Sequence, residues 1–169
     1  MANRFRKVPT KFDSAFLIEP KVYEDFRGFF KESFRKNEFL DLGINVDFVQ
    51  DNIAYSTKGV LRGMHYDHAV NKLVQVISGR TYHVIVDLRD GSPSFKQWQA
   101  FILSGTNHKQ IFVPAGFANG YLVLSDKVWV SYKQGTYFTD EGARVLKWND
   151  PSVGIKWPID NPLLSEQDK

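Results

Sequence analysis

The stretch KLVQVISGRTYHVIVDL, residues 72–88, decides the fold class of this chain. Two runs rich in β-branched and aromatic residues, 72–77 and 80–88, are separated by the pair Ser78-Gly79. Two such runs around a short break that contains glycine are typical of a β-hairpin. The stretch therefore predicts two antiparallel strands.

The second of these runs alternates in a way that assigns its side chains to two faces of a sheet. Successive side chains of a strand point to opposite sides. One face carries apolar and aromatic residues and the other carries polar residues as well. The first face consists of Tyr82, Val84, Val86 and Leu88, and the second of His83, Ile85 and Asp87.

Outward from the hairpin, the chain continues as short strand-like runs between turn residues. Many short strands with Gly, Pro, Asn and Ser between them predict an all-β antiparallel sandwich or barrel. Besides the hairpin, the predicted strands cover residues 15–20, 28–34, 97–103, 109–113, 121–124 and 128–133.

The remaining segments predict little helix and one domain. Residues 35–43 predict one short helix, with Gly43 just past its end as a left-handed cap. The tail from Pro151 carries Pro158 and Pro162 and is expected to wrap around the sheets. No repeat, low-complexity run or linker interrupts the chain, so residues 1–169 are expected to form a single domain.

Just upstream of the hairpin, the segment GVLRGMHYDHAVNKLVQV (59–76) places Arg62, His65 and Lys72 close together in a half-buried sheet. Ionisable side chains on an inner face are costly to bury unless they are paired or used. A base and a cation in one pocket suit removal of a proton from carbon next to a carbonyl and stabilisation of the resulting enolate. This segment predicts an enzyme of that chemistry.

Composition narrows the class of protein further. The chain has 169 residues, a formal net charge of +3 and 15% aromatic residues, and it lacks blocks of like charge, which favours a phosphate-bearing small ligand over nucleic acid. It contains no cysteine, which excludes disulfides and thiolate nucleophiles or metal ligands. No apolar run approaches the ~20 residues of a membrane span, and the first residues lack an apolar signal core. A cytoplasmic protein is expected.

Seven segments, in order, cover nearly the whole chain with a specific pattern: EDFRGFFKESF (24–34), FVQDNIAYSTKGVLRGMHYD (48–67), KLVQVISGRTYHVIVDLR (72–89), IFVPAGFANGYLVLS (111–125), YKQGTYF (132–138), WNDPSVGIKWP (148–158) and LSEQD (164–168). Together they make the chain resemble the dTDP-4-dehydrorhamnose 3,5-epimerase family of cupin-type nucleotide-sugar enzymes. The resemblance implies a cupin-type jelly-roll β-sandwich with a few short helices over residues 1–169. It also implies an isomerase that inverts carbon 3, carbon 5 or both in a nucleotide-linked 4-keto-6-deoxy sugar.

The resemblance also implies roles for individual residues. His65 matches the general base, Asp168 its acidic partner, and Tyr132 the acid that returns a proton to the opposite face of the sugar. Lys72 matches the cation beside the enolate oxygen. No cofactor or metal is required by this scheme, and a homodimer that exchanges an N-terminal strand is expected. Residues that match the family's substrate-binding positions are Arg27, Glu32, Gln50, Asn52 and Arg62.

Three positions depart from the family pattern. Asn119 stands in GFANGY where the family usually has GFAHGF, and it is expected to contact substrate without titrating. Ala143 replaces a common acidic residue, and Gln167 a common lysine. These departures leave open one or two inverted carbons, a thymidine, guanosine or cytidine nucleotide, and a hexose or heptose.

Several alternatives remain at this point. His68, His83 and His108 are expected to be structural, although His65 and His68 together raise the possibility of a cupin metal site. The spacing HYDH and the nearby Lys72 argue against metal. A 3,4-keto-isomerase would not need the opposite-face acid Tyr132, and a non-catalytic nucleotide-sugar-binding module would not need the base.

Overall fold

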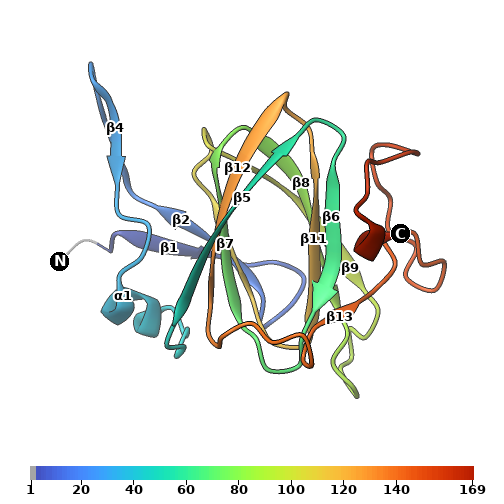
Figure 1. The fold of residues 1–169 in the computed structure, drawn as a ribbon. Helices are drawn as coiled ribbons and strands as arrows, with labels where there is room; N and C mark the ends of the chain where they lie inside the picture. The colour runs from blue at the N-terminus through green and yellow to red at the C-terminus, as the bar shows by residue number, and fades with distance from the viewer. Residues whose placement is uncertain (1–2) are drawn as a thin grey trace.

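The computed structural model describes residues 3–169 as two antiparallel sheets packed face to face, with little helix (Figure 1). The six-stranded sheet has the order β1-β2-β10-β7-β12-β5. Its strands are β1 (Phe5–Val8), β2 (Phe16–Pro20), β5 (Gln50–Thr57), β7 (Lys72–Ser78), β10 (Gln110–Val113) and β12 (Lys127–Gln134).

The second sheet has five strands in the order β13-β6-β11-β8-β9. The all-β sandwich expected from the sequence is therefore confirmed. The strands of this sheet are β6 (Leu61–Tyr66), β8 (Arg80–Asp87), β9 (Trp98–Ser104), β11 (Phe117–Val123) and β13 (Arg144–Val145).

The two strands predicted over 72–88 form, but the prediction that they pair as a hairpin is wrong, because the connection between them crosses from one sheet to the other. Strand β7 belongs to the six-stranded sheet and β8 to the five-stranded sheet. Between them Gly79 has a φ of 85°, and a Cβ at this position would lie 2.2 Å from the carbonyl oxygen of Lys127. Only glycine fits this connection, because the left-handed conformation and the close backbone approach both exclude a side chain.

The core between the sheets is aliphatic and aromatic. Val74, Val76, Ile85 and Ile111 are among its buried members. The outer face of the five-stranded sheet is also buried, because the C-terminal segment packs over Val84 and Val86 through side chains such as Trp157. Figure 1 shows this segment on the far side of β6 and β13, as expected of a wrapping tail.

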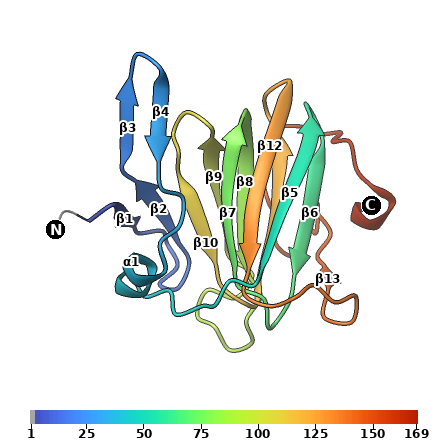
Figure 2. The same ribbon diagram turned by 60° about the vertical axis from the view of Figure 1, so that its left-hand side comes forward.

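The N-terminal part of the chain forms a separate arm. Strands β3 (Val22–Asp25) and β4 (Gly28–Lys31) pair only with each other and project beyond the sheets (Figure 2). The helix α1 (Lys36–Asp41) follows, shorter than the predicted 35–43, and Gly43 beyond it has a φ of 92°. The buried side chain of Phe39 fixes this helix against the outer face of the six-stranded sheet.

Candidate active site

A cavity of about 140 Å³ lies between the two sheets, and we call it the main cavity. Both sheets contribute polar side chains to it, which is unusual for the inside of a sandwich. They include Arg62, His65, Lys72, His83, Asn119 and Tyr132.

A second hollow of about 150 Å³, the side hollow, adjoins the main cavity. His65, Lys72 and Tyr132 line both spaces, so these three side chains stand where the two meet. The side hollow also contains Ala143 and Gln167, two of the positions that depart from the family pattern. A ligand with two parts could therefore occupy both spaces and present its junction to the three shared residues.

His65 and Asp168 form the closest ionisable pair of the site. Nε2 of His65 lies 2.7 Å from Oδ1 of Asp168, whose side chain is only 5% exposed. The other carboxylate oxygen accepts a hydrogen bond of 2.8 Å from Oγ of Ser165. Because a carboxylate can only accept, Nε2 of His65 donates, and the lone pair of Nδ1 is left free to take a proton.

The C-terminal segment brings Asp168 to this position by pairing with strand β6. The backbone N–H of Leu163 donates to the carbonyl of Gly59 at 2.8 Å, and Leu61 donates to the carbonyl of Leu163 at 3.0 Å. The short 3-10 turn Glu166–Asp168 then directs the Asp168 side chain toward His65. Although it lies near the end of the sequence, this carboxylate is held by backbone hydrogen bonds.

A register shift in the pairing of β6 and β11 explains how both Arg62 and His65 face the cavity. His65 pairs with Asn119 and Arg62 with Tyr121, so two residues of β6, 63 and 64, lie opposite the single residue Gly120 of β11. Such an irregularity breaks the strict alternation of side chains. Two residues three positions apart can therefore point to the same side.

Lys72 reaches the site from the opposite sheet. Burial lowers the pKa of its ammonium group, and the charge of Asp67 partly opposes this shift. An ammonium group removed from water interacts more strongly with a developing negative charge than an exposed one does. Lys72 is therefore suited to stabilise an oxyanion in the cavity.

Tyr132 lies on β12, in the same sheet as Lys72. Burial raises the pKa of its hydroxyl, and the guanidinium of Arg62 acts in the opposite direction. Arg62 is itself held by its Nε, which donates to Oγ of Ser56 at 2.9 Å. The phenol thus remains a proton donor at neutral pH, next to a cation that would stabilise its phenolate.

The amide residues lie at different distances from the cavity. Asn119 lines it, and its Nδ2 donates to the carbonyl of His65 at 3.1 Å. Gln50 and Asn52 lie on β5, where Nε2 of Gln50 donates to Oδ1 of Asn52 at 2.9 Å. Asn52 pairs in register with Tyr132, and its Nδ2 is buried without a hydrogen-bond partner in the described residues.

Four of the predicted substrate-binding residues line neither space: Gln50 and Asn52 on β5, and Arg27 and Glu32 in the N-terminal part of the chain. Arg27 is at the turn between β3 and β4, where its exposed side chain pairs with Asp25 at 2.6 Å. Glu32 pairs with Arg35 at 3.2 Å and with Arg4 at 3.4 Å. Within one copy of the chain, neither is brought to the cavity.

The histidines that the sequence suggested were structural fall into two groups. His68 packs on Tyr66 and His108 on Phe29, with ring centroids 5.6 Å and 4.5 Å apart, and neither lines the main cavity. His65 and His68 therefore do not share a site. His83, in contrast, is in the cavity wall, so the prediction of a structural role missed a residue of the site.

Comparison with known proteins agrees with this fold. The family model described as dTDP-4-dehydrorhamnose 3,5-epimerase matches residues 9–169. The dTDP-4-dehydrorhamnose 3,5-epimerase of Shigella flexneri is 44% identical over 165 residues, which cover 95% of this chain and 91% of that protein. The chain has the jelly-roll fold of the cupin-type sugar-nucleotide epimerases, and it belongs to the dTDP-4-dehydrorhamnose 3,5-epimerase family.

Solved structures extend the similarity to three dimensions. The dTDP-6-deoxy-D-glucose-3,5-epimerase of Legionella pneumophila, solved with dTDP-4-keto-L-rhamnose, is 43% identical with a TM-score of 0.93, over 97% of this chain and 89% of that chain. ChmJ, a 3'-monoepimerase from Streptomyces bikiniensis solved with dTDP-quinovose, is 31% identical with a TM-score of 0.88, over 95% of this chain and 83% of that chain. The fold thus occurs both in proteins described as 3,5-epimerases and in one described as a 3'-monoepimerase.

Proposed function

We propose that this protein inverts carbon 3, and in the full reaction also carbon 5, of a nucleotide-linked 4-keto-6-deoxy sugar. The observation that carries the proposal is that His65 and Tyr132 come from facing sheets into one cavity, with Lys72 lining the same cavity. A base and an acid on opposite sides of a sugar ring are the requirement for inverting a carbon centre. The family relatives support the substrate class.

The first step removes a proton from the carbon beside the ketone. Nδ1 of His65 takes this proton, the electron pair of the C–H bond forms a C=C bond to the carbonyl carbon, and the π pair of the carbonyl moves to oxygen, which gives the enolate. Asp168 stabilises the imidazolium through Nε2, and the ammonium of Lys72 stabilises the enolate oxygen.

The second step returns a proton to the opposite face. The hydroxyl of Tyr132 donates it to the same carbon, and the carbonyl re-forms as the enolate collapses. Arg62 lies close enough to favour the phenolate that remains. His65 then loses its proton to water and Tyr132 regains one, so the protein is unchanged after a turnover.

Isotope exchange tests this proposal directly. The protein is incubated in heavy water with thymidine-, guanosine- and cytidine-diphosphate-linked 4-keto-6-deoxy sugars, and the products are reduced and analysed. Deuterium at carbon 3, with or without carbon 5, is expected for at least one nucleotide. Absence of deuterium from every sugar would remove the epimerase proposal.

A reaction restricted to carbon 3 is a second candidate, favoured by Asn119. Its amide is engaged with the backbone of His65 and cannot exchange a proton as an imidazole would. Deuterium at carbon 3 alone would support this candidate, whereas deuterium at both carbons would exclude it.

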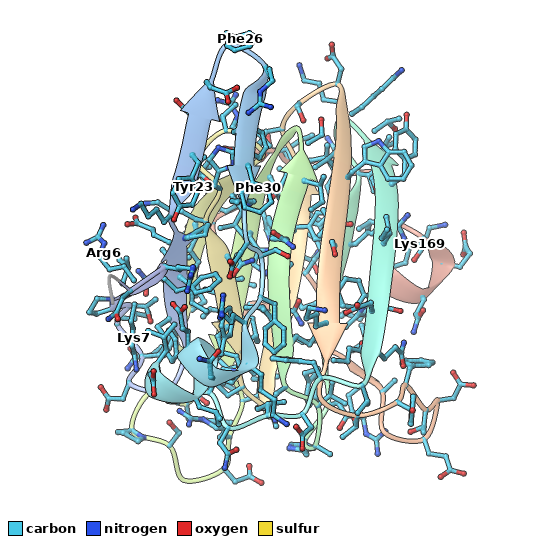
Figure 3. All side chains as sticks on the ribbon, turned by 90° about the vertical axis from the view of Figure 1, so that its left-hand side faces the viewer. Arg6, Lys7, Tyr23, Phe26, Phe30 and Lys169 are labelled. Atoms are coloured by element: carbon cyan, nitrogen blue, oxygen red, sulfur yellow. The ribbon has the colours of Figure 1, made fainter. Side chains whose placement is uncertain are left out.

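We also propose a homodimer in which the arm of β3 and β4 reaches the partner. Apolar side chains on this arm are exposed, with Phe26 98% and Phe30 65% exposed, and Figure 3 shows Phe26 at its tip. The outer face of the six-stranded sheet also exposes Ile53 and Trp129. Because β1 already pairs with β2 of its own chain, the exchanged segment would be the arm.

In such a dimer Arg27 and Glu32 would bind substrate in the cavity of the second copy. Mixed dimers of Arg27→Ala and His65→Ala chains, prepared by joint refolding, test this arrangement. If sites are shared, the mixture contains dimers with one intact site and recovers activity that both parent proteins lack. Recovery no greater than the sum of the parents would contradict it.

Two broader predictions accompany the proposal. Residues 1–169 are expected to act as one domain, so that unfolding in urea follows a single transition by fluorescence and circular dichroism. Among residues 3–169 there is no helix with the length and apolar character needed to cross a bilayer. A cytoplasmic location remains a prediction, and it suits a nucleotide-linked substrate.

A further inference from the structure

His83 is a buried polar residue of the cavity that the reaction above does not use. It lies on β8 opposite Tyr121 of β11, and its side chain is 1% exposed. The imidazole and phenol rings are stacked, with centroids 6.1 Å apart and an angle of 15° between their planes. Both residues line the main cavity.

Each of the two rings also carries a buried polar atom that is available for a hydrogen bond. Nε2 of His83 and Oη of Tyr121 are both buried, and in the part of the chain that the structure describes neither has a partner in good hydrogen-bond geometry. The hydroxyl of Ser56 lies near Oη of Tyr121, but it already accepts a hydrogen bond from Nε of Arg62. Buried polar groups in folded proteins are almost always hydrogen-bonded, since burial without a partner costs free energy. Two such atoms on one wall of a ligand cavity indicate that the ligand supplies the partner.

Both groups are neutral at the pH at which an enzyme works. Burial, and in addition the ammonium of Lys72, lower the pKa of His83 to about 3. Burial raises the pKa of Tyr121, while the nearby Ser56 and Arg62 act against that shift. A neutral imidazole and a phenol each donate and accept hydrogen bonds without adding charge.

The chemistry of this wall selects one kind of ligand group. A phosphate or carboxylate is better matched by Arg62 and Lys72, which are cations in the same cavity. A methyl group would leave both polar atoms without partners. A hydroxyl group can donate to one ring and accept from the other.

We propose that His83 and Tyr121 form a neutral hydrogen-bonding subsite that holds a hydroxyl group of the sugar and thereby determines which sugars are accepted. The proposal rests on the epimerase function argued above. The hydroxyl on carbon 3 changes position when that carbon is inverted, so it is not the group held. Two sources remain: the hydroxyl on carbon 2 of the ring, and one on the substituent of carbon 5 in sugars that are not 6-deoxy.

Three substrates distinguish these sources: a nucleoside-diphosphate-linked 4-keto-6-deoxyhexose, its 2-deoxy analogue, and the corresponding 4-keto-hexose with a hydroxyl on carbon 6. The unmodified protein is expected to favour the sugar that carries the bound hydroxyl by about 10-fold or more in kcat/KM over the matched sugar without it. Preference for the 6-deoxyhexose over its 2-deoxy analogue assigns carbon 2. Preference for the 6-hydroxylated sugar over the 6-deoxyhexose assigns carbon 6.

Tyr121→Phe is the decisive variant, because it removes one hydroxyl and keeps the ring. It should abolish most of the preference, because kcat/KM should fall more for the sugar that carries the bound hydroxyl than for the matched sugar without it. Tyr82→Phe is the matched control. Tyr82 is on the outer face of β8, where its hydroxyl donates to the carbonyl of Lys156 at 2.9 Å, and its loss should not change the preference.

His83→Gln and His83→Leu complete the test. Because a changed side chain in the cavity wall can disturb folding, both variants are first checked for native circular dichroism and unfolding temperature. His83→Gln should keep part of the preference and His83→Leu none of it. The acid limb of the pH profile of kcat should be the same in His83→Gln as in the unmodified protein, because His83 carries no proton in the reaction.

The outcomes separate the subsite from the reaction itself. No deuterium exchange with any sugar would overturn the epimerase function and the subsite with it. If deuterium is exchanged but kcat/KM is the same for all three sugars, the epimerase function stands and the proposed subsite is overturned. An equal loss on all three sugars in Tyr121→Phe would also overturn the subsite, because that is the effect of a purely structural ring.

Discussion

Nε2 of His65 lies 2.7 Å from Oδ1 of Asp168, although 103 positions separate the two residues in the sequence. Strand β6 supplies the imidazole and the C-terminal segment supplies the carboxylate. The contact joins an inner wall of the sandwich to the segment that wraps its outside. This arrangement makes the state of the base depend on the docking of the tail.

Asp168→Asn is expected to reduce kcat by about 10²- to 10⁴-fold with little change in KM. An amide would donate to Nε2, place the ring proton on Nδ1 and so block the atom that must accept the proton. Steady-state kinetics on the best sugar of the exchange experiment measure this. Glu166→Gln, at an exposed position of the same turn, is the control, and equal losses in both variants would contradict the dyad.

Tyr132→Phe is expected to separate proton removal from inversion. His65 would still exchange the proton on its own face, so deuterium should enter the recovered substrate. Inverted product should fall by about 10²-fold or more, since no acid remains on the other face. Mass and proton spectra of recovered sugar and product measure both quantities.

Tyr137→Phe, with a side chain exposed to solvent, is the control for Tyr132→Phe. Unchanged inversion in Tyr132→Phe would assign the acid to another residue. Loss of deuterium exchange and inversion together would indicate a role for Tyr132 in binding.

We expect deprotonation of Lys72 to determine how kcat falls at high pH. Only its charged form stabilises the enolate, and its pKa is lowered by burial, so kcat should be maintained below that pKa and decline as pH rises through it, at a pH below 10.5. Tyr132, whose pKa is raised, should titrate later. Lys72→Arg should lose this decline at a lower overall kcat, because arginine stays charged throughout. A basic limb at the same pH in Lys72→Arg would assign it to another group.

A side chain at position 120 is expected to lower activity by disturbing the strands next to His65. A Cβ at this position would lie 2.7 Å from Sδ of Met64 and 2.8 Å from the carbonyl oxygen of Arg62, so β6 and β11 would have to separate beside His65. Gly120→Ala should cost about 1–3 kcal/mol in the free energy of unfolding and also lower kcat.

Gly91→Ala is the matched comparison for Gly120→Ala. Gly91 has a φ of 72° in a loop away from the main cavity, with no neighbour within 4 Å of an added Cβ. Its substitution should reduce stability without changing kcat. Urea unfolding and kinetics on both variants check this, and an unaltered kcat in Gly120→Ala would contradict the link to His65.

The sequence was most informative where strand alternation and turn chemistry agree. Both strands over 72–88 were predicted because Ser78-Gly79 interrupts two β-rich runs, and they form as β7 and β8. Their pairing as a hairpin was wrong, because the turn leads from one sheet to the other. Strand β5 was not predicted. Its polar residues Gln50 and Asn52 face inward, while Ile53 and Tyr55 are exposed, which reverses the usual pattern.

The site residues, too, could be predicted from the sequence only in part. Arg62, His65 and Lys72 could be grouped from one short segment, because an inner sheet face rarely carries such side chains without a use. His83 was missed because Tyr82, Val84 and Val86 form the more apolar face of β8, which suggests the core. The tail buries that face from outside, so the other face, with His83 and Ile85, is the inner one. The sequence shows that the side chains of β8 alternate between two faces. It does not show that the C-terminal segment buries the face with Tyr82, Val84 and Val86, because that contact comes from residues far along the chain.

His65 belongs to the five-stranded sheet and Tyr132 to the six-stranded sheet. The width of the gap between the sheets therefore sets how far apart the two proton-handling groups stand, and a flat enolate must fit between them. If warming widens the gap between the two sheets, proton removal and proton return would no longer be matched. Mixed epimers or unreacted sugar would then accumulate at temperatures at which the chain is still folded.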